Sequence, residues 1–168
     1  MNKENYVKLM SYWQEHRRFC KCLIAVEKSV EIAVIISYAA LLLYSLYVNI
    51  GFALRSAVTS IIALYLCTLI RFVVNAKRPY QVFETLPAMN KDTLGQSFPS
   101  RHLTSISVIA VSMLYMNIAL GCIFFALMVL MGALRVLLGV HFVKDVTVGA
   151  AIGIVIGILG LYALSYIT

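Results

Sequence analysis

Charged residues are scarce in this chain of 168 residues, and acidic residues are the scarcest. Asp and Glu together number 7 against 14 Lys and Arg, and charged residues make up 12% of the sequence while hydrophobic residues make up 62%. A soluble domain of this size could not bury so much apolar surface, because only about half of an ordinary domain is apolar. The composition excludes a soluble protein and indicates one integral membrane domain, in agreement with a mean hydropathy of +0.91.

The chain has four cysteines, and their spacing excludes a zinc or disulfide framework. Cys20 and Cys22 form a lone C-x-C pair, while Cys67 and Cys122 lie in different apolar runs. A zinc site needs four convergent ligands, and nothing completes that set. The few carboxylates are not clustered as Mg²⁺ would require. We therefore predict no metal and no cofactor.

The net charge of +7 raises the question of a nucleic-acid partner. The basic residues lie in the N-terminal segment and beside apolar runs, which fits anionic headgroups or a phosphorylated substrate better than a duplex. Membrane lipids or a phosphorylated substrate are thus the predicted partners, with no nucleic acid. We also expect no cleavable signal peptide, because the first long apolar run begins near Val30 and exceeds the length of one.

The N-terminal segment, residues 1–28, carries an apolar stripe among charged residues. The stripe consists of Tyr6, Leu9, Met10 and Trp13, spaced as on one face of a helix. This pattern predicts an amphipathic helix in the membrane interface, or a helix that packs on the end of the protein's own bundle. Both alternatives stay open, and the remaining residues, 29–168, form the predicted transmembrane domain.

Prolines number only three, so little interrupts the apolar runs. Five runs are long enough for a membrane crossing of about 20 residues. They cover approximately residues 30–50, 52–74, 103–120, 122–140 and 146–167. The predicted fold class is all-α, an integral membrane bundle of about five transmembrane helices plus the N-terminal interfacial helix. The polar stretch between the second and third runs predicts an active-site loop at residues 75–101.

Three glycines of the last run, Gly149, Gly153 and Gly157, recur at four-residue spacing. Small residues at this period allow helices to approach closely in lipid. The face that they form predicts packing inside the bundle or, alternatively, a homodimer interface.

Ionisable residues gather where the runs end. In an antiparallel bundle, the end of the second run, the start of the third, the end of the fourth and the start of the fifth share one membrane face. Arg71 and Arg78 mark the first of these points and share a helical face if the helix continues that far. Guanidinium groups bind phosphate oxygens; the alternative is that both arginines snorkel to the interface.

Ser100, Arg101 and His102 precede the third run. Ser100 is a natural N-cap, and the free N–H groups of a first helical turn make an anion site that His102 can reach. The alternative is a capping serine beside an interfacial histidine.

Arg135, His141 and Asp145 end the fourth run and begin the fifth. His141 and Asp145 are four residues apart, so the carboxylate can hold the imidazole in one tautomer. Gly139 offers a place for the helix to end and the chain to bend back. An ion pair of Asp145 with Arg135 or Lys144 is the structural alternative. Together, the three clusters describe a phosphoryl-transfer site, with a covalent intermediate favoured over metal chemistry.

These residues resemble the type 2 phosphatidic acid phosphatase superfamily, whose pattern is K-x6-R-P, P-S-G-H and S-R-x5-H-x3-D. The corresponding segments here are R-x6-R-P from Arg71 to Pro79, P-S-R-H from Pro99 to His102, and L-R-x5-H-x3-D from Leu134 to Asp145. The resemblance implies that His141 accepts the phosphoryl group, that Asp145 orients it, and that His102 protonates the leaving oxygen. It also implies a phosphate-binding set of Arg71, Arg78, Ser100, Arg101 and Arg135.

Three positions depart from the family pattern. Arg71 replaces a lysine, Arg101 a glycine and Leu134 a serine, and none of these changes removes a catalytic group. The resemblance therefore implies an active, metal-independent phosphatase. The short chain is similar to compact bacterial members such as undecaprenyl-pyrophosphate phosphatases, with phosphatidate and phosphatidylglycerophosphate as other candidate substrates.

Two further questions stay open at the level of sequence. Family members place the site on the extracytoplasmic face, whereas the basic N-terminal segment would make the same face cytoplasmic by the positive-inside rule. A non-catalytic lipid-phosphate binding or transport protein is the alternative function, and it would not need His102, His141 and Asp145 together. A third hypothesis, a small channel or assembly scaffold, is supported only by the glycine repeat of the last run.

Overall fold

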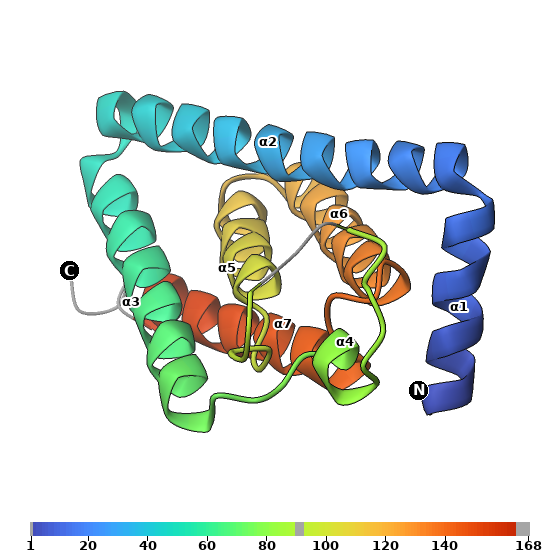
Figure 1. The fold of residues 1–168 in the computed structure, drawn as a ribbon. Helices are drawn as coiled ribbons and strands as arrows, with labels where there is room; N and C mark the ends of the chain where they lie inside the picture. Colours follow the sequence, from blue (N-terminus) through green and yellow to red (C-terminus); the bar gives the residue numbers. More distant parts are fainter. Residues whose placement is uncertain (1, 90–92, 164–168) are drawn as a thin grey trace.

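The computed structural model describes residues 2–89 and 93–163, which fold into a bundle of helices (Figure 1). The all-α prediction is confirmed. The helices are α1 (Lys3–Glu15), α2 (Arg17–Val48), α3 (Ile50–Val74), α4 (Pro79–Val82), α5 (Arg101–Met116), α6 (Ile118–Leu137) and α7 (Val143–Ile158), followed by a π-helical turn, η1 (Leu159–Ala163).

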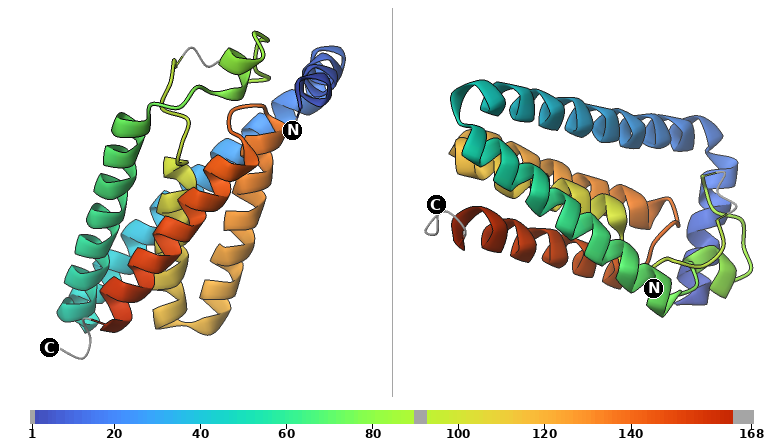
Figure 2. Two further views of the ribbon diagram at one scale, coloured as in Figure 1. Left: turned by 90° about the horizontal axis from the view of Figure 1, so that it is seen from below. Right: turned by 90° about the vertical axis from the view of Figure 1, so that its left-hand side faces the viewer.

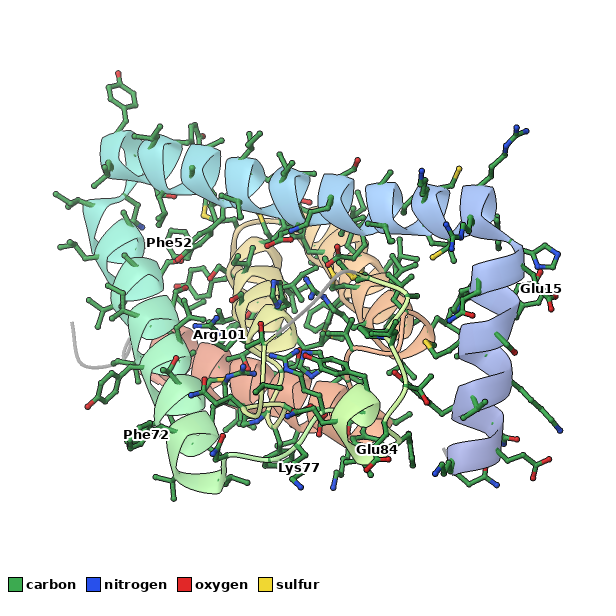
Figure 3. The ribbon with its side chains drawn as sticks, in the orientation of Figure 1. Glu15, Phe52, Phe72, Lys77, Glu84 and Arg101 are labelled. Carbon is green, nitrogen blue, oxygen red and sulfur yellow. The ribbon has the colours of Figure 1, made fainter. Side chains whose placement is uncertain are left out.

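Four helical stretches are long and apolar enough to cross a membrane: Arg17–Val48, Ile50–Val82, Ile118–Leu137 and Val143–Tyr162. Their outer faces carry large apolar side chains, as lipid contact requires. Phe72 is 74% exposed and points away from the bundle, whereas Phe52 is 1% exposed and points into it (Figure 3). The predicted end of the last span, residues 164–167, lies outside the described residues.

Helix α5 has only 16 residues and forms the centre of the bundle (Figure 1). It packs against α2, α3, α6 and α7. Ten of its residues are buried, including Leu103, Thr104 and Ser107. A helix that is surrounded by other helices needs no apolar belt for lipid, and its small hydroxyl residues let neighbours approach closely. Because α2, α3, α6 and α7 surround α5, they fix the position of its N-terminus.

The glycine face of α7 packs against α5. A Cβ atom on Gly149 would meet the backbone of Ser100, and one on Gly153 would meet the backbone of Thr104. Gly157 is also buried, and a Cβ atom on it would meet the side chain of Val111. Of the two predicted uses of this face, packing inside the bundle is therefore the one found, and the face is covered within the chain.

Helix α1 runs across the end of the bundle next to α4 (Figure 2). Its predicted apolar stripe is buried at Tyr6, Met10 and Trp13, which pack with residues of the α4 segment and of the α6–α7 connection. The Tyr6 hydroxyl donates to the Gly139 carbonyl (3.0 Å), and Trp13 Nε1 donates to the Leu137 carbonyl (2.9 Å). The stripe thus packs on the end of the protein's own bundle, as the second of the two predicted alternatives states.

Several helix bounds differ from the predicted ones. The first long helix begins at Arg17, because the chain turns at His16, so the predicted boundary at residue 28 falls inside α2. Asn49 separates α2 from α3, and Asn117 separates α5 from α6, whereas the apolar runs placed these breaks near residues 51 and 121. The side chain of Asn117 accepts from the Leu120 N–H (3.1 Å) and caps α6. Gly121 lies within α6, where a Cβ would clash with Leu114 of α5.

Candidate active site

The C-terminal ends of α3 and α6 meet the N-terminal ends of α5 and α7 at one end of the bundle, below the connection that contains α4 (Figure 2). The Ser100 N–H donates to the Asp145 carbonyl (2.9 Å) and joins the starts of α5 and α7. Arg71 Nη1 donates to the Pro99 carbonyl (2.8 Å) and joins α3 to the same point. The prediction that these ends share one face is confirmed.

Arg71 and Arg78 do not share a helical face, because the condition for it, a helix that continues from Arg71 to Arg78, is not met. Helix α3 ends at Val74, because Asn75 adopts a left-handed backbone conformation with φ 42°. Arg78 follows in an extended conformation and returns to the site because its Nε donates to the Gly95 carbonyl (3.1 Å). Both arginines are buried, at 5% and 4% exposure, whereas Lys77 is exposed and points outward (Figure 3).

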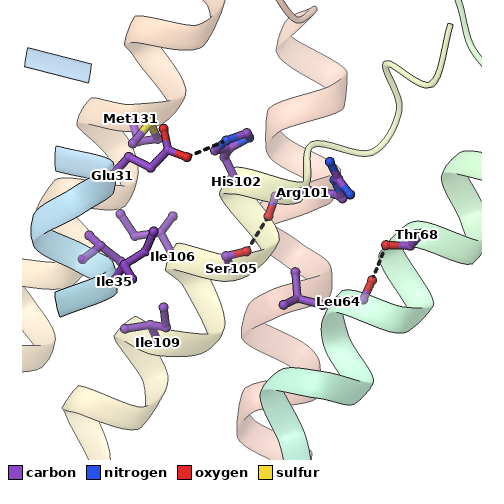
Figure 4. Close-up of a pocket in the computed structure, with 11 residues that line it drawn as sticks. Glu31, Ile35, Leu64, Thr68, Arg101, His102, Ser105, Ile106, Ile109 and Met131 are labelled. Atoms are coloured by element: carbon purple, nitrogen blue, oxygen red, sulfur yellow. Dashed lines mark hydrogen bonds and ion pairs between the residues drawn. The ribbon is translucent and has the colours of Figure 1, made fainter. Parts of the chain in front are cut away.

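Ser100 occupies the N-cap position of α5, as predicted, but its side chain makes no capping hydrogen bond. Its Oγ is buried and has no hydrogen-bond partner among the described residues. Arg101 is exposed at the start of the helix, and Arg101 and His102 leave the first turn in different directions (Figure 4). The serine hydroxyl is therefore available to a ligand and not to the helix.

The segment from Arg135 to Asp145 folds back on itself, as Gly139 predicts. Helix α6 ends at Leu137, and Gly139 has φ 73°, a conformation that glycine adopts without strain. The returning chain donates from the His141 N–H to the Arg135 carbonyl (3.3 Å). The break thus brings His141 beside Arg135, which a continuous helix could not do.

Asp145 faces one nitrogen of the His141 ring. Asp145 Oδ2 lies 3.6 Å from His141 Nδ1 and accepts hydrogen bonds from the Phe142 N–H (3.0 Å) and the Ser97 hydroxyl (2.5 Å). Ser97 Oγ is also 3.4 Å from His141 Nδ1. A carboxylate at Nδ1 favours the tautomer that carries its proton there, which leaves the Nε2 lone pair for reaction.

Burial lowers the pKa of His141 to about 4. The carboxylate of Asp145 opposes this shift, while the positive charges of Arg78 and Arg135 act in the same direction as burial. The ring is therefore neutral near pH 7, which is the form that a nucleophile requires.

Two carboxylates of α2 contact the site and were not predicted. Glu27 forms an ion pair with Arg135, and both side chains are buried. Glu31 lies 3.8 Å from Arg135 and 3.3 Å from His102 Nε2. Because Arg135 pairs with Glu27 and Asp145 faces His141, the alternative of an Asp145–Arg135 ion pair is wrong. The available signal was two acidic residues one helical turn apart beside an apolar run.

Buried donors without a partner gather at this site. Within the described residues they are Arg78 Nη1, Arg135 Nε, Arg135 Nη1 and the Ser100 hydroxyl. A buried donor that makes no hydrogen bond costs about 1–3 kcal/mol, and more when it is charged. Donors of this kind, on three separate segments around His141, fit an anion with several oxygens.

A groove of about 320 Å³ opens beside His102, between α2, α3 and α5 (Figure 4). Glu31, Arg101 and His102 form its polar end, and the rest of its lining is mainly apolar. No three of the described His, Cys, Asp and Glu residues are grouped as a metal site requires.

Comparison with known proteins relates this arrangement to one family. The family model of the PAP2 superfamily matches residues 52–168. The crystal structure of Aquifex aeolicus LpxE superimposes with a TM-score of 0.70 at 24% identity, over 82% of this chain and 84% of that one. A second structure, "the first transmembrane PAP2 type phosphatidylglycerolphosphate phosphatase from Bacillus subtilis", gives a TM-score of 0.52 at 18% identity, over 97% of each chain. No curated protein matches significantly.

Proposed function

Because this chain belongs to the PAP2 superfamily, we propose that it is a membrane lipid phosphatase that cleaves a phosphate monoester or pyrophosphate through a phosphohistidine. The observation that carries the proposal is the set of unpartnered donors on Arg78, Ser100 and Arg135 around a neutral histidine. Guanidinium and hydroxyl donors match the oxygens of a phosphoryl group, and pre-placed donors stabilise the charge of its transition state.

In the first step, Nε2 of His141 attacks phosphorus, and the bond from phosphorus to the leaving oxygen breaks. His102 gives its proton to that oxygen, while the Asp145 carboxylate, 3.6 Å from Nδ1, stabilises the charge on the ring. In the second step, a water molecule gives a proton to His102 and attacks phosphorus. The N–P bond breaks, and phosphate leaves with His141 neutral again. The phosphate-holding groups are Arg71, Arg78, Ser100, Arg135 and the backbone N–H of Arg101.

The groove beside His102 supports a lipid substrate. Its polar end lies at the predicted acid, and apolar side chains such as Ile35, Leu64 and Ile109 line much of the rest (Figure 4). We propose undecaprenyl pyrophosphate as the first substrate to test, with phosphatidate and phosphatidylglycerophosphate as the other candidates. The site is proposed to lie on the extracytoplasmic face of the cell membrane.

The test is phosphate release by purified protein in detergent, with EDTA present, across those three lipids. We expect turnover by the wild type, loss of at least about 1,000-fold in His141→Ala, and inhibition by vanadate. His16→Ala is the matched control, because His16 is exposed between α1 and α2. A strict metal requirement or equal rates in His141→Ala would refute the mechanism, and tight binding without turnover would favour a lipid-phosphate binder.

A further inference from the structure

Helix α2 contributes two acidic residues to a site that otherwise consists of basic and neutral groups. Glu27 is 0% exposed and pairs with Arg135, and Glu31 is one turn further along the helix. Glu31 bridges Arg135 (3.8 Å), His102 (3.3 Å) and Lys28 (2.9 Å), and Figure 4 shows its contact with His102. Both carboxylates precede residues 52–168, the part of the chain that the family model matches.

We propose that Glu27 and Glu31 are positioning residues, which hold Arg135 and His102 in place for phosphoryl transfer; the inference rests on the proposed function. The ion pair of Glu27 with Arg135 is made at the Nη2 atom of the guanidinium. The Nε and Nη1 donors have no partner among the described residues, so they remain for the phosphate. The carboxylate fixes one side of the guanidinium and leaves its other donors to the substrate.

A role in stability alone does not account for this arrangement. Replacing a buried ion pair by apolar residues is often neutral or stabilising, because desolvation offsets the attraction. A carboxylate next to a phosphate site also repels the phosphate. Glu27 and Glu31 therefore weaken ground-state binding of the anion, while they restrict two long or mobile side chains to one geometry. Correct geometry of catalytic groups affects the chemical step far more than it affects substrate binding.

The proposal therefore predicts two effects in opposite directions, a lower kcat and a tighter binding of inorganic phosphate. In Glu27→Gln and in Glu31→Gln we expect kcat to fall at least about 10-fold, because Arg135 or His102 loses its support. We expect inorganic phosphate to bind about 5-fold more tightly in the same variants, because a neighbouring negative charge is gone. A defect that is merely structural would lower kcat and weaken phosphate binding or leave it unchanged.

The experiment measures kcat on the best lipid of the substrate panel and the Kd of inorganic phosphate by calorimetry in detergent. Glu4→Gln is the matched control, since Glu4 pairs with Lys8 on the exposed face of α1 and should change neither quantity. Thermal unfolding checks that each variant folds. Glu31→Gln keeps the buried Glu27–Arg135 pair intact, so it tests the proposal even where Glu27→Gln does not fold.

The outcomes separate this inference from the proposed function. Turnover by the wild type and its loss in His141→Ala test the function alone. If the wild type turns over but the glutamine variants bind phosphate no more tightly, or keep their kcat, the positioning role is wrong and the phosphatase stands. If the wild type neither turns over nor binds phosphate, both are wrong. If it binds without turnover, tighter binding in the variants still supports the placement of the carboxylates, and unchanged or weaker binding overturns it.

Discussion

The His141 ring is held by a carboxylate that is itself held by other groups. Asp145 Oδ2 receives the Ser97 hydroxyl at 2.5 Å and the Phe142 N–H at 3.0 Å. Groups that orient a catalytic side chain are often as important as the side chain itself. Ser97 comes from the α4–α5 connection, so this segment helps to position His141, the proposed nucleophile.

We therefore expect Ser97→Ala to lower kcat about 10-fold with little change in KM. The substitution removes the hydroxyl that donates to Asp145, so the carboxylate and the His141 ring beside it are held less firmly. Steady-state kinetics on the preferred lipid measure both constants. Ser11→Ala is the control, because the Ser11 hydroxyl only bonds its own helix on an exposed face. An unchanged kcat in Ser97→Ala would show that Phe142 alone orients the carboxylate.

The low pKa of His141 predicts how stability depends on pH. The pKa is about 4 in the folded protein, below the value of about 6.5 for a free histidine. As pH falls from about 6.5 to 4, the unfolded chain binds a proton at this residue and the folded chain does not. Stability contributed by the neutral ring is complete above pH 6.5 and is lost over that window.

Thermal unfolding in detergent between pH 7 and pH 4.5 measures this effect. We expect the wild type to lose more of its Tm over that range than His141→Gln, which has no titrating ring. His16→Gln should behave as the wild type does, because His16 is exposed. Equal losses in the wild type and His141→Gln would mean that His141 titrates normally.

At the scale of the helices, the sequence predicted what depends on local chemistry. Apolar runs located the long helices, and Gly139 marked the break that returns His141 to Arg135, because only a residue with positive φ suits that turn. The predicted positions of the helix ends were less accurate, because the side chains of Asn49 and Asn117 cap α3 and α6, and hydropathy does not detect such caps. The path from Asn75 to Arg78 was not predictable, because it depends on contacts with Gly95 across the loop.

The contact between α5 and α7 predicts a large cost for one added methyl group. In Gly153→Ala the new Cβ would meet the Thr104 carbonyl and the Val108 N–H, which are backbone atoms that cannot move aside. We expect a loss of about 1–3 kcal/mol in stability, measured as a lower Tm. Gly51→Ala is the control, because the nearest atom to its Cβ is Asn49 Oδ1 at 3.5 Å.

Gly51→Ala should be neutral or slightly stabilising, because alanine favours a helix over glycine by up to about 1 kcal/mol. The same two variants test the use of the glycine face. If Gly153 lies in a homodimer interface instead, Gly153→Ala changes the mass measured by light scattering and leaves the Tm of the monomer unaffected.

At the scale of the whole molecule, the three motifs locate most of the site because they lie at helix ends that a bundle must bring together. Glu27 and Glu31 lie outside those motifs, and their role depends on how α2 is rotated against α6. Hydropathy alone does not determine that rotation. A buried arginine in a membrane bundle does, however, require a partner, and this requirement restricts the search to the few acidic residues of the chain.

Two considerations bear on the orientation in the membrane: the positive-inside rule, and the need of a phosphate site for positive charge. The exposed Arg17, Arg18 and Lys21 lie near the start of α2, at the same end of the bundle as the site (Figure 2). The positive-inside rule would place that end in the cytoplasm. A site for lipid phosphates needs positive charge on whichever face it occupies, so basic residues near the site are weak evidence of topology. The basic start of α2 is therefore compatible with the extracytoplasmic face proposed above.

Labelling of single cysteines in intact cells tests this orientation. In a cysteine-free background that retains activity, we expect an impermeant maleimide to label Leu86→Cys, in the exposed connection on the site side, and to leave Tyr47→Cys unlabelled. Tyr47 is 92% exposed near the far end of α2, so it is the matched control for the opposite face. Both variants should react after the cells are broken. The reverse pattern in intact cells would place the site in the cytoplasm, and the basic start of α2 would then follow the positive-inside rule.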